Sequence, residues 1–135
     1  MLDRRAKDAG PRPRVLVVDD DDQLCTTICE VLRDDGFAAA SVPHGAAALE
    51  MAKAHEPALI LLDLRMPIMD GWSFVEQYRR ASVAPAAIIL MSGNADLEGI
   101  AQHLGADGHL RKPFDLEELR SRVASQLAAD SQGAS

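Results

Sequence analysis

Residues 58–71 decide the fold of this chain, and they read ALILLDLRMPIMDG. The apolar run at the start of this stretch ends at Asp63, as expected of a buried strand that finishes on a carboxylate. Pro67 favours an extended backbone before it, and Gly71 lets the chain turn into a helix. The stretch therefore predicts a buried strand over 58–63, a short loop, and a helix that begins at Gly71.

Three other strand-like segments also end on polar side chains. Residues 15–18 are followed by the carboxylates of Asp19–Asp22, residues 86–91 are followed by Ser92, and a later segment leads into Lys112. In open parallel α/β sheets, ligands bind at the edge formed by the carboxyl ends of the strands. The sequence thus predicts an acidic cluster, a lone aspartate, a hydroxyl and a lysine at the ligand-binding edge of one sheet.

Strand and helix patterns alternate along the whole chain. Strands are expected over 14–19, 37–42, 58–63, 86–91 and 107–111, and helices over 22–34, 45–55, 71–80, 95–104 and 115–128. Such alternation implies right-handed crossovers and a doubly wound α/β fold with five parallel strands and five helices. We expect one domain over 14–128, with flexible tails at 1–13 and 129–135.

Composition excludes several classes of function. The 135 residues carry a net charge of −7, which argues against direct binding of nucleic acid by this chain. The longest apolar runs are too short to span a bilayer, and the amino terminus lacks an apolar secretory core. Cys25 and Cys29 lie one helical turn apart, where a disulfide is unfavourable, so reduced thiols in a cytoplasmic protein are expected.

The run Asp19–Asp22 has two interpretations. One aspartate after a strand commonly accepts backbone N–H bonds as a helix cap, and Asp21 or Asp22 satisfies that need. Four consecutive carboxylates also repel one another, and a hard divalent cation would relieve this repulsion. We therefore predict that the run as a whole contributes to a Mg²⁺ site.

The residues of these strand ends, and above all the stretch 63–71, resemble the receiver domain of bacterial two-component response regulators. The resemblance covers about 14–128 and is to the stand-alone, chemotaxis-regulator-like kind. It implies the strand order 2-1-3-4-5. It also implies that Asp19, Asp20 and Asp63 bind Mg²⁺, with Mn²⁺ as an alternative.

The same resemblance implies a function. Asp63 would accept a phosphoryl group from a sensor histidine kinase or a histidine phosphotransfer protein, while Ser92 and Lys112 would contact that group. The Lys112–Pro113 bond would be cis. Output would pass to a downstream effector protein, through onward phosphotransfer, or through a phosphorylation-dependent homodimer. The chain would be a signalling switch rather than an enzyme.

Two residues near these positions need separate expectations. His109 stands where receivers usually carry Tyr or Phe, the aromatic partner of Ser92 in the switch. It is interpreted either as a half-exposed strand residue that fills the position or as a pH-dependent switch. Trp72 is expected to pack at the start of its helix, near enough to Asp63 to report on it.

Three rival functions share part of this pattern. A hydrolase with an aspartyl-phosphate intermediate usually has a second aspartate two residues after the nucleophile, where this chain has Arg65. A flavodoxin-like electron carrier needs a phosphate-binding loop after the first strand, and Asp19–Asp22 would repel a flavin phosphate. A receiver fold that serves as an unphosphorylated scaffold is the third. It is disfavoured because every expected site position holds a competent residue.

Overall fold

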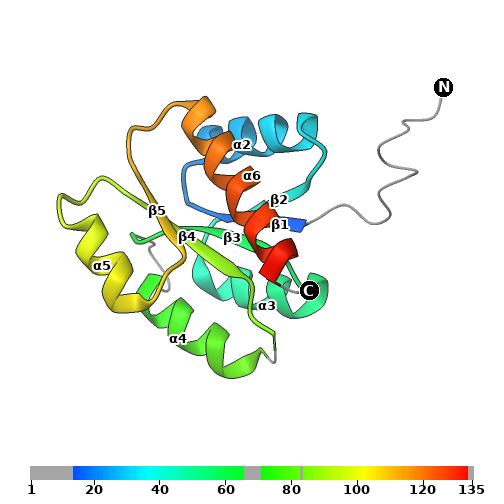
Figure 1. The fold of residues 1–135 in the computed structure, drawn as a ribbon. Coiled ribbons are helices and arrows are strands. Elements are labelled where there is room, and N and C mark those ends of the chain that lie inside the picture. The colour runs from blue at the N-terminus through cyan, green and yellow to red at the C-terminus, as the bar shows by residue number, and fades with distance from the viewer. Residues whose placement is uncertain (1–13, 66–70, 83, 134–135) are drawn as a thin grey trace.

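The structure is a computed structural model that describes residues 14–65, 71–82 and 84–133 (Figure 1), with side chains as far as residue 129. The expected tail at 1–13 and the loop residues 66–70 of the receiver-like motif lie outside the described residues. The elements are, in chain order, β1 (Arg14–Val18), α2 (Asp22–Asp34), β2 (Ala38–Val42), α3 (Gly45–His55), β3 (Leu59–Asp63), α4 (Gly71–Ala81), β4 (Ala87–Ser92), α5 (Leu97–Leu104), β5 (Gly108–Arg111) and α6 (Leu116–Gly133).

All five strands form one parallel sheet in the order β2-β1-β3-β4-β5. This confirms the doubly wound α/β fold and the strand order that the sequence and its resemblance predict. Within the sheet, β2 lies on one side of β1, and β3, the next strand in the sequence, lies on the other side of β1. The carboxyl ends of β1 and β3 therefore flank the topological switch point, where such sheets bind ligands.

Helices cover both faces of the sheet (Figure 1), with α2 and α6 on one face and α3, α4 and α5 on the other. Side chains of β1, β3 and β4 alternate between these layers. Residues such as Leu16 and Ile60 pack toward α3, α4 and α5, whereas Val17 and Leu61 pack toward α2 and α6. Because β3 is buried on both faces, its apolar residues form a continuous run rather than an alternating one.

Two helices differ from their predicted bounds by two residues or more, and α4 ends one residue later than predicted, at Ala81. α6 continues to Gly133, into the range predicted as a flexible tail, because no glycine or proline interrupts the sequence from 116 to 132. α5 begins at Leu97 rather than 95, because the Asn94 side chain accepts a bond from the Asp96 N–H at 2.8 Å and forms a turn there.

Gly99 weakens α5 by its helix propensity, and a side chain at this position would require the Asp96 side chain to move. A Cβ atom at position 99 would lie 2.6 Å from a carboxylate oxygen of Asp96. The Asp96 side chain therefore lies over the first turn of α5, in the space that a larger residue would occupy.

Both cysteines lie on α2, where Cys25 and Cys29 are buried free thiols. Burial, followed by the negative charge of Asp19, raises the pKa of Cys25 to about 11, so this thiol stays protonated. Among the described residues, no helix is both long enough and apolar enough to cross a bilayer.

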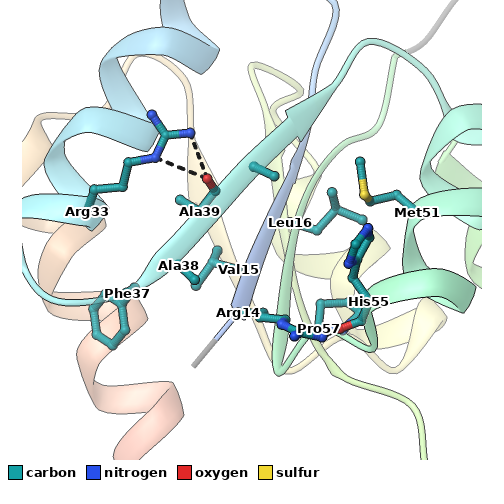
Figure 2. A pocket seen from close by; sticks show the side chains of 11 residues that line it. Arg14, Val15, Leu16, Arg33, Phe37, Ala38, Ala39, Met51, His55 and Pro57 are labelled. Atoms are coloured by element: carbon teal, nitrogen blue, oxygen red, sulfur yellow. Dashed lines mark hydrogen bonds between the residues drawn. The ribbon is translucent and has the colours of Figure 1, made fainter. Parts of the chain in front are cut away.

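β2 forms one edge of the sheet and is built mainly of alanine. The Asp19 N–H bonds to the Val42 carbonyl, so the carbonyl of Ala39, an odd number of residues away, points outward from β1. Arg33 of α2 donates to this carbonyl from Nε at 3.2 Å and from Nη2 at 2.8 Å (Figure 2).

A cavity of about 430 Å³ lies beside β2, lined in part by Phe37, Met51 and His55 (Figure 2). It adjoins the amino ends of β1 and β2, since Arg14 and Ala38 also line it. The carboxyl-terminal edge of the sheet, where the predicted site residues lie, is at the opposite ends of these strands.

The hydroxyl of Tyr78 allows a direct test of how α4 packs against the sheet. The Tyr78 side chain, on α4, is buried in the core. Its hydroxyl oxygen accepts the Ala86 N–H at 2.7 Å and so connects α4 to the start of β4. Tyr78→Phe leaves that N–H without its partner and should lower the free energy of unfolding by about 1–2 kcal/mol. Urea denaturation measures the change, and the exposed Glu76→Gln on the same helix is the control. Equal stability of the Tyr78→Phe variant and the wild type would contradict the assigned bond.

Candidate metal and phosphoryl site

The sheet brings Asp19 and Asp63 together at the switch point. Val18 of β1 is the register partner of Leu62 of β3, so the two aspartates follow at equivalent places on neighbouring strands. By strand alternation, both aspartates lie on the face of the sheet that α2 and α6 cover. Their side chains are almost fully buried, with residue exposures of 1% for Asp19 and 6% for Asp63.

Asp20 completes a cluster of three carboxylates. One oxygen each of Asp19, Asp20 and Asp63 lies within 4.8 Å of the other two, a spacing that could hold a metal ion. Asp21 serves the other predicted role, because its carboxylate accepts the Leu24 N–H at 3.1 Å and caps α2. The structure thus divides the acidic run between helix capping and the cluster.

Lys112 provides the positive charge in this cluster. Its Nζ lies 2.6 Å from Oδ2 of Asp19 and 3.8 Å from Oδ1 of Asp63. Burial lowers the pKa of Lys112, but the hydrogen bond to Asp19 and the charges of Asp63 and Asp19 outweigh it and give a net rise. Lys112 is therefore a fixed cation at neutral pH. The Lys112–Pro113 peptide bond is cis.

The surroundings of Asp63 displace the pKa of its carboxyl group. Burial, reinforced by the negative charge of Asp19, raises its pKa to about 6, although the positive charge of Lys112 acts in the opposite direction. The N–H of Arg65 donates to Oδ1 of Asp63 at 3.2 Å and also favours the ionised form. Asp63 is thus mostly ionised near pH 7, and as an ionised carboxylate it can act as a nucleophile.

Gly71 is a site residue whose role was predicted only as a turn. A Cβ atom there would lie 3.1 Å from Cα of Leu64 and 3.4 Å from the carbonyl oxygen of Asp63. A side chain there would force the backbone at the end of β3 or the start of α4 to shift, so glycine favours this close approach. The signal in the sequence was its position in an Asp-Gly pair after a strand, which indicates a turn and not a close approach.

Ser92 is buried at the end of β4, next to the strand that carries Asp63. Its hydroxyl oxygen accepts the Asn94 N–H at 3.0 Å, so it is engaged with the loop that precedes α5. His109 is half-buried on β5 as the register partner of Leu90, while Ser92 is the partner of Arg111. His109 therefore lies two register pairs away from Ser92 along the ladder.

The expectation for Trp72 is wrong for its side chain, which is 41% exposed. Its ring lies against that of His103 on α5, with centroids 5.8 Å apart and planes inclined by 60°. Trp72 lies on the same face of α4 as the exposed Glu76 and Arg79, so its side chain points away from the core and its ring meets α5. Trp72 is thus placed to report on α5.

A doubly wound sheet with a carboxylate cluster and a lysine at its switch point defines a receiver-type domain. The family model described as "Response regulator receiver domain" matches residues 15–124. The chain belongs to this family, whose members are signalling proteins. The signal receiver domain of a putative Luxo repressor protein from Vibrio parahaemolyticus has the same fold, with a TM-score of 0.83 at 28% identity over 91% of this chain and 95% of that one.

Two curated relatives come from mycobacteria. Transcriptional regulatory protein PrrA of Mycobacterium tuberculosis is 39% identical over 116 residues, 85% of this chain and 50% of the relative. DNA-binding response regulator MtrA of Mycolicibacterium smegmatis is 37% identical over 118 residues, 86% of this chain and 51% of the relative. The chain thus spans about half the length of the curated relatives it matches.

These names give no support to the prediction that nucleic acid is not a partner. MtrA is called DNA-binding, whereas we predicted no nucleic-acid partner from the net charge of −7. That charge describes only the residues of this chain and carries no information about the half of each relative that the chain does not span.

The raised pKa of Asp63 predicts a specific dependence of stability on pH. The folded state holds the Asp63 proton more tightly than the unfolded chain, so this group contributes stability below about pH 4. That contribution is lost as the pH rises from about 4 through 6. In metal-free buffer, Asp63→Asn should therefore be more stable than the wild type by about 2–3 kcal/mol at pH 7.5, with the gap closing toward pH 4.

Urea denaturation at a series of pH values, with a chelator present, measures this gap. Glu50→Gln, which makes the same chemical change at an exposed position of α3, is the control and should show no gap that grows with pH. Parallel stability curves for the wild type and Asp63→Asn between pH 4 and 7.5 would show that Asp63 is not held in an unfavourable ionised state.

Proposed function

We propose that this chain is the phosphoacceptor switch of a two-component phosphorelay, with Asp63 as the residue that takes the phosphoryl group. The observation that carries this proposal is the buried Asp63 carboxylate, which lies 3.8 Å from the Lys112 ammonium and within 4.8 Å of the Asp19 and Asp20 oxygens. A nucleophile, a fixed cation and a candidate metal cluster at one sheet edge are the parts that phosphoryl transfer needs.

The donor set fits Mg²⁺. Hard carboxylate oxygens are the ligands that Mg²⁺ prefers, and the Lys112 ammonium on Asp19 shows that the cluster attracts a cation. Asp19, Asp20 and Asp63 would hold the ion, and Mn²⁺, with similar ligand preferences, would replace it. The bound ion would offset the negative charge of the phosphoryl oxygens.

The chain's own residues would act in a defined order. An ionised Asp63 oxygen attacks the phosphorus atom of a phosphohistidine, the P–N bond breaks, and the released imidazole nitrogen takes up a proton. Lys112 offers its ammonium to a phosphoryl oxygen, and the Ser92 hydroxyl donates to another. Attack of water on the phosphorus later releases inorganic phosphate and restores the Asp63 carboxylate.

The donor would be a sensor histidine kinase or a histidine phosphotransfer protein in the cytoplasm. Output would pass to an effector protein, through onward phosphotransfer, or through a phosphorylation-dependent homodimer. The switch function is favoured over a hydrolase because the residue two positions after Asp63 is Arg65, which offers a backbone N–H to Asp63 rather than a second acid. It is favoured over an unphosphorylated scaffold because the carboxylates and Lys112 converge.

The first test is chemical labelling of Asp63. Incubation with acetyl phosphate and Mg²⁺ should add one phosphoryl group, seen as a single mass increase that alkali removes because acyl phosphates are base-labile. Asp63→Asn should not acquire it, whereas Glu50→Gln should label like the wild type. A label that maps to Asp70 or to a histidine, or one that survives alkali, would refute the assignment of Asp63.

The second test concerns the metal ligands. Replacing both Asp19 and Asp20 by Asn removes two of the three carboxylates, so Mg²⁺ binding and Mg²⁺-dependent labelling of Asp63 should be lost. Isothermal titration calorimetry measures the binding, and phosphoryl incorporation measures the reaction. Asp22→Asn makes the same change in the adjacent acidic run outside the cluster and should retain both. Labelling of the double variant at the wild-type rate would exclude these ligands.

A further inference from the structure

The peptide group that joins Asp19 to Asp20 connects two of the three carboxylates in the cluster. A peptide group is planar, so the direction of the Asp19 carbonyl also sets where the backbone of Asp20 leaves that plane. Neither residue belongs to a strand or a helix, since β1 ends at Val18 and α2 begins at Asp22. The orientation of this peptide group therefore depends on individual contacts rather than on regular secondary structure.

A buried thiol supplies such a contact. Sγ of Cys25 lies 3.3 Å from the Asp19 carbonyl oxygen, and the sulfur carries the hydrogen of this bond, because a carbonyl oxygen only accepts. The exposed fraction is 5% for Cys25 and 1% for Asp19. Within the described part of the chain, neither the Asp19 carbonyl nor the Asp20 N–H has another hydrogen-bond partner, so the thiol is the group that orients this peptide.

The start of α2 holds the thiol in place. The Cys25 N–H donates to the Asp21 carbonyl at 3.0 Å, and the Asp21 side chain caps the helix by accepting the Leu24 N–H at 3.1 Å. Cys25 also packs among the buried residues between α2 and the sheet. Its side chain thus reaches back past the amino end of the helix to a residue six positions earlier.

The other polar atoms of Asp19 are also engaged. Its N–H donates to the Val42 carbonyl at 3.2 Å, its Oδ1 accepts the Asp21 N–H at 3.0 Å, and its Oδ2 accepts a bond from the Lys112 ammonium at 2.6 Å. The Asp20 carboxylate is exposed and accepts no hydrogen bond from the described residues. Asp19 is thus held at every polar atom, whereas Asp20 is placed mainly through the peptide group that the two residues share.

We infer that Cys25 is a positioning residue for the metal ligands, because its thiol orients the peptide group between Asp19 and Asp20. This rests on the proposed function, in which these carboxylates hold Mg²⁺. Cys25 does not touch the ion. Without its hydrogen bond the two carboxylates would sample more arrangements, and binding would have to order them, which lowers the affinity for Mg²⁺.

Isothermal titration calorimetry with Mg²⁺ tests this role in variants that keep every carboxylate. Cys25→Ala removes the donor and should weaken Mg²⁺ binding about two- to fivefold, the lower part of the range for a lost hydrogen bond, because a thiol is a weak donor. Cys25→Val also lacks the donor but fills the space left in the core, so it should lose as much affinity. Cys25→Ser keeps a donor and should bind Mg²⁺ with close to wild-type affinity.

Cys29→Ala is the matched control. Cys29 lies one turn later on α2, is 4% exposed and shares the neighbouring Ser41 side chain with Cys25. It makes no hydrogen bond to Asp19 or Asp20 within the described residues. This variant should lose a similar amount of stability to urea as Cys25→Ala, yet keep wild-type Mg²⁺ affinity. It therefore separates positioning of the ligands from a general loss of packing.

The labelling of Asp63 by acetyl phosphate gives a second readout. At limiting Mg²⁺, Cys25→Ala should label more slowly than the wild type, because less of it carries the ion. At saturating Mg²⁺ the two rates should be equal, since Asp63 and Lys112 are unchanged. A rate that stays slow at saturating Mg²⁺ would show that Cys25 acts on the reaction other than through the metal ligands, and would overturn the inference.

The remaining contrary outcomes are distinct. Wild-type Mg²⁺ affinity in Cys25→Ala or Cys25→Val, an equal loss in Cys29→Ala, or a loss in Cys25→Ser as large as in Cys25→Ala would each overturn the positioning role. Wild-type protein that binds no Mg²⁺ would overturn the metal assignment and this inference with it. Wild-type protein that binds Mg²⁺ but is not labelled at Asp63 would overturn the phosphoacceptor function, while the calorimetry would still decide the role of Cys25.

Discussion

Burial of Asp19 and Asp63 side by side is the constraint on which the site depends. Parallel pairing of β1 with β3 places both carboxylates at one switch point, at 1% and 6% exposure, where their charges repel and water cannot screen them. The Lys112 ammonium offsets part of this cost, and the remainder raises the pKa of Asp63 to about 6. The pairing of β1 with β3 thus holds together carboxylates whose charges repel one another.

The sheet also separates two sets of residues by strand alternation. Asp19, Asp63 and Lys112 belong to the side that α2 and α6 cover, whereas Arg111 projects toward α5. The cluster and α5 therefore lie on different faces of one sheet. The ends of β4 and β5 lie between them, joined by the bond from the Lys112 N–H to the Ser92 carbonyl at 2.9 Å.

Residue patterns predicted the parts of this arrangement that depend on the local chain. The apolar run before Asp63 indicated β3. The resemblance supplied the strand order and the choice of Asp19 and Asp20 as the acidic residues that lie beside Asp63. Contacts between distant elements were not predictable in this way. The exposure of Trp72, its ring contact with His103 and the bonds from Arg33 to Ala39 depend on register and on helix orientation, which a single sequence does not encode locally.

The contact between Arg33 and Ala39 has a consequence for the open edge of the sheet. β2 exposes outward-facing backbone groups, and its alanines are too small to shield them from another extended chain. An incoming strand would need the Ala39 carbonyl as an acceptor, but the Arg33 guanidinium already occupies it and places a cation in the path. The Arg33 contact therefore makes the β2 edge a poor template for pairing with a strand of another molecule.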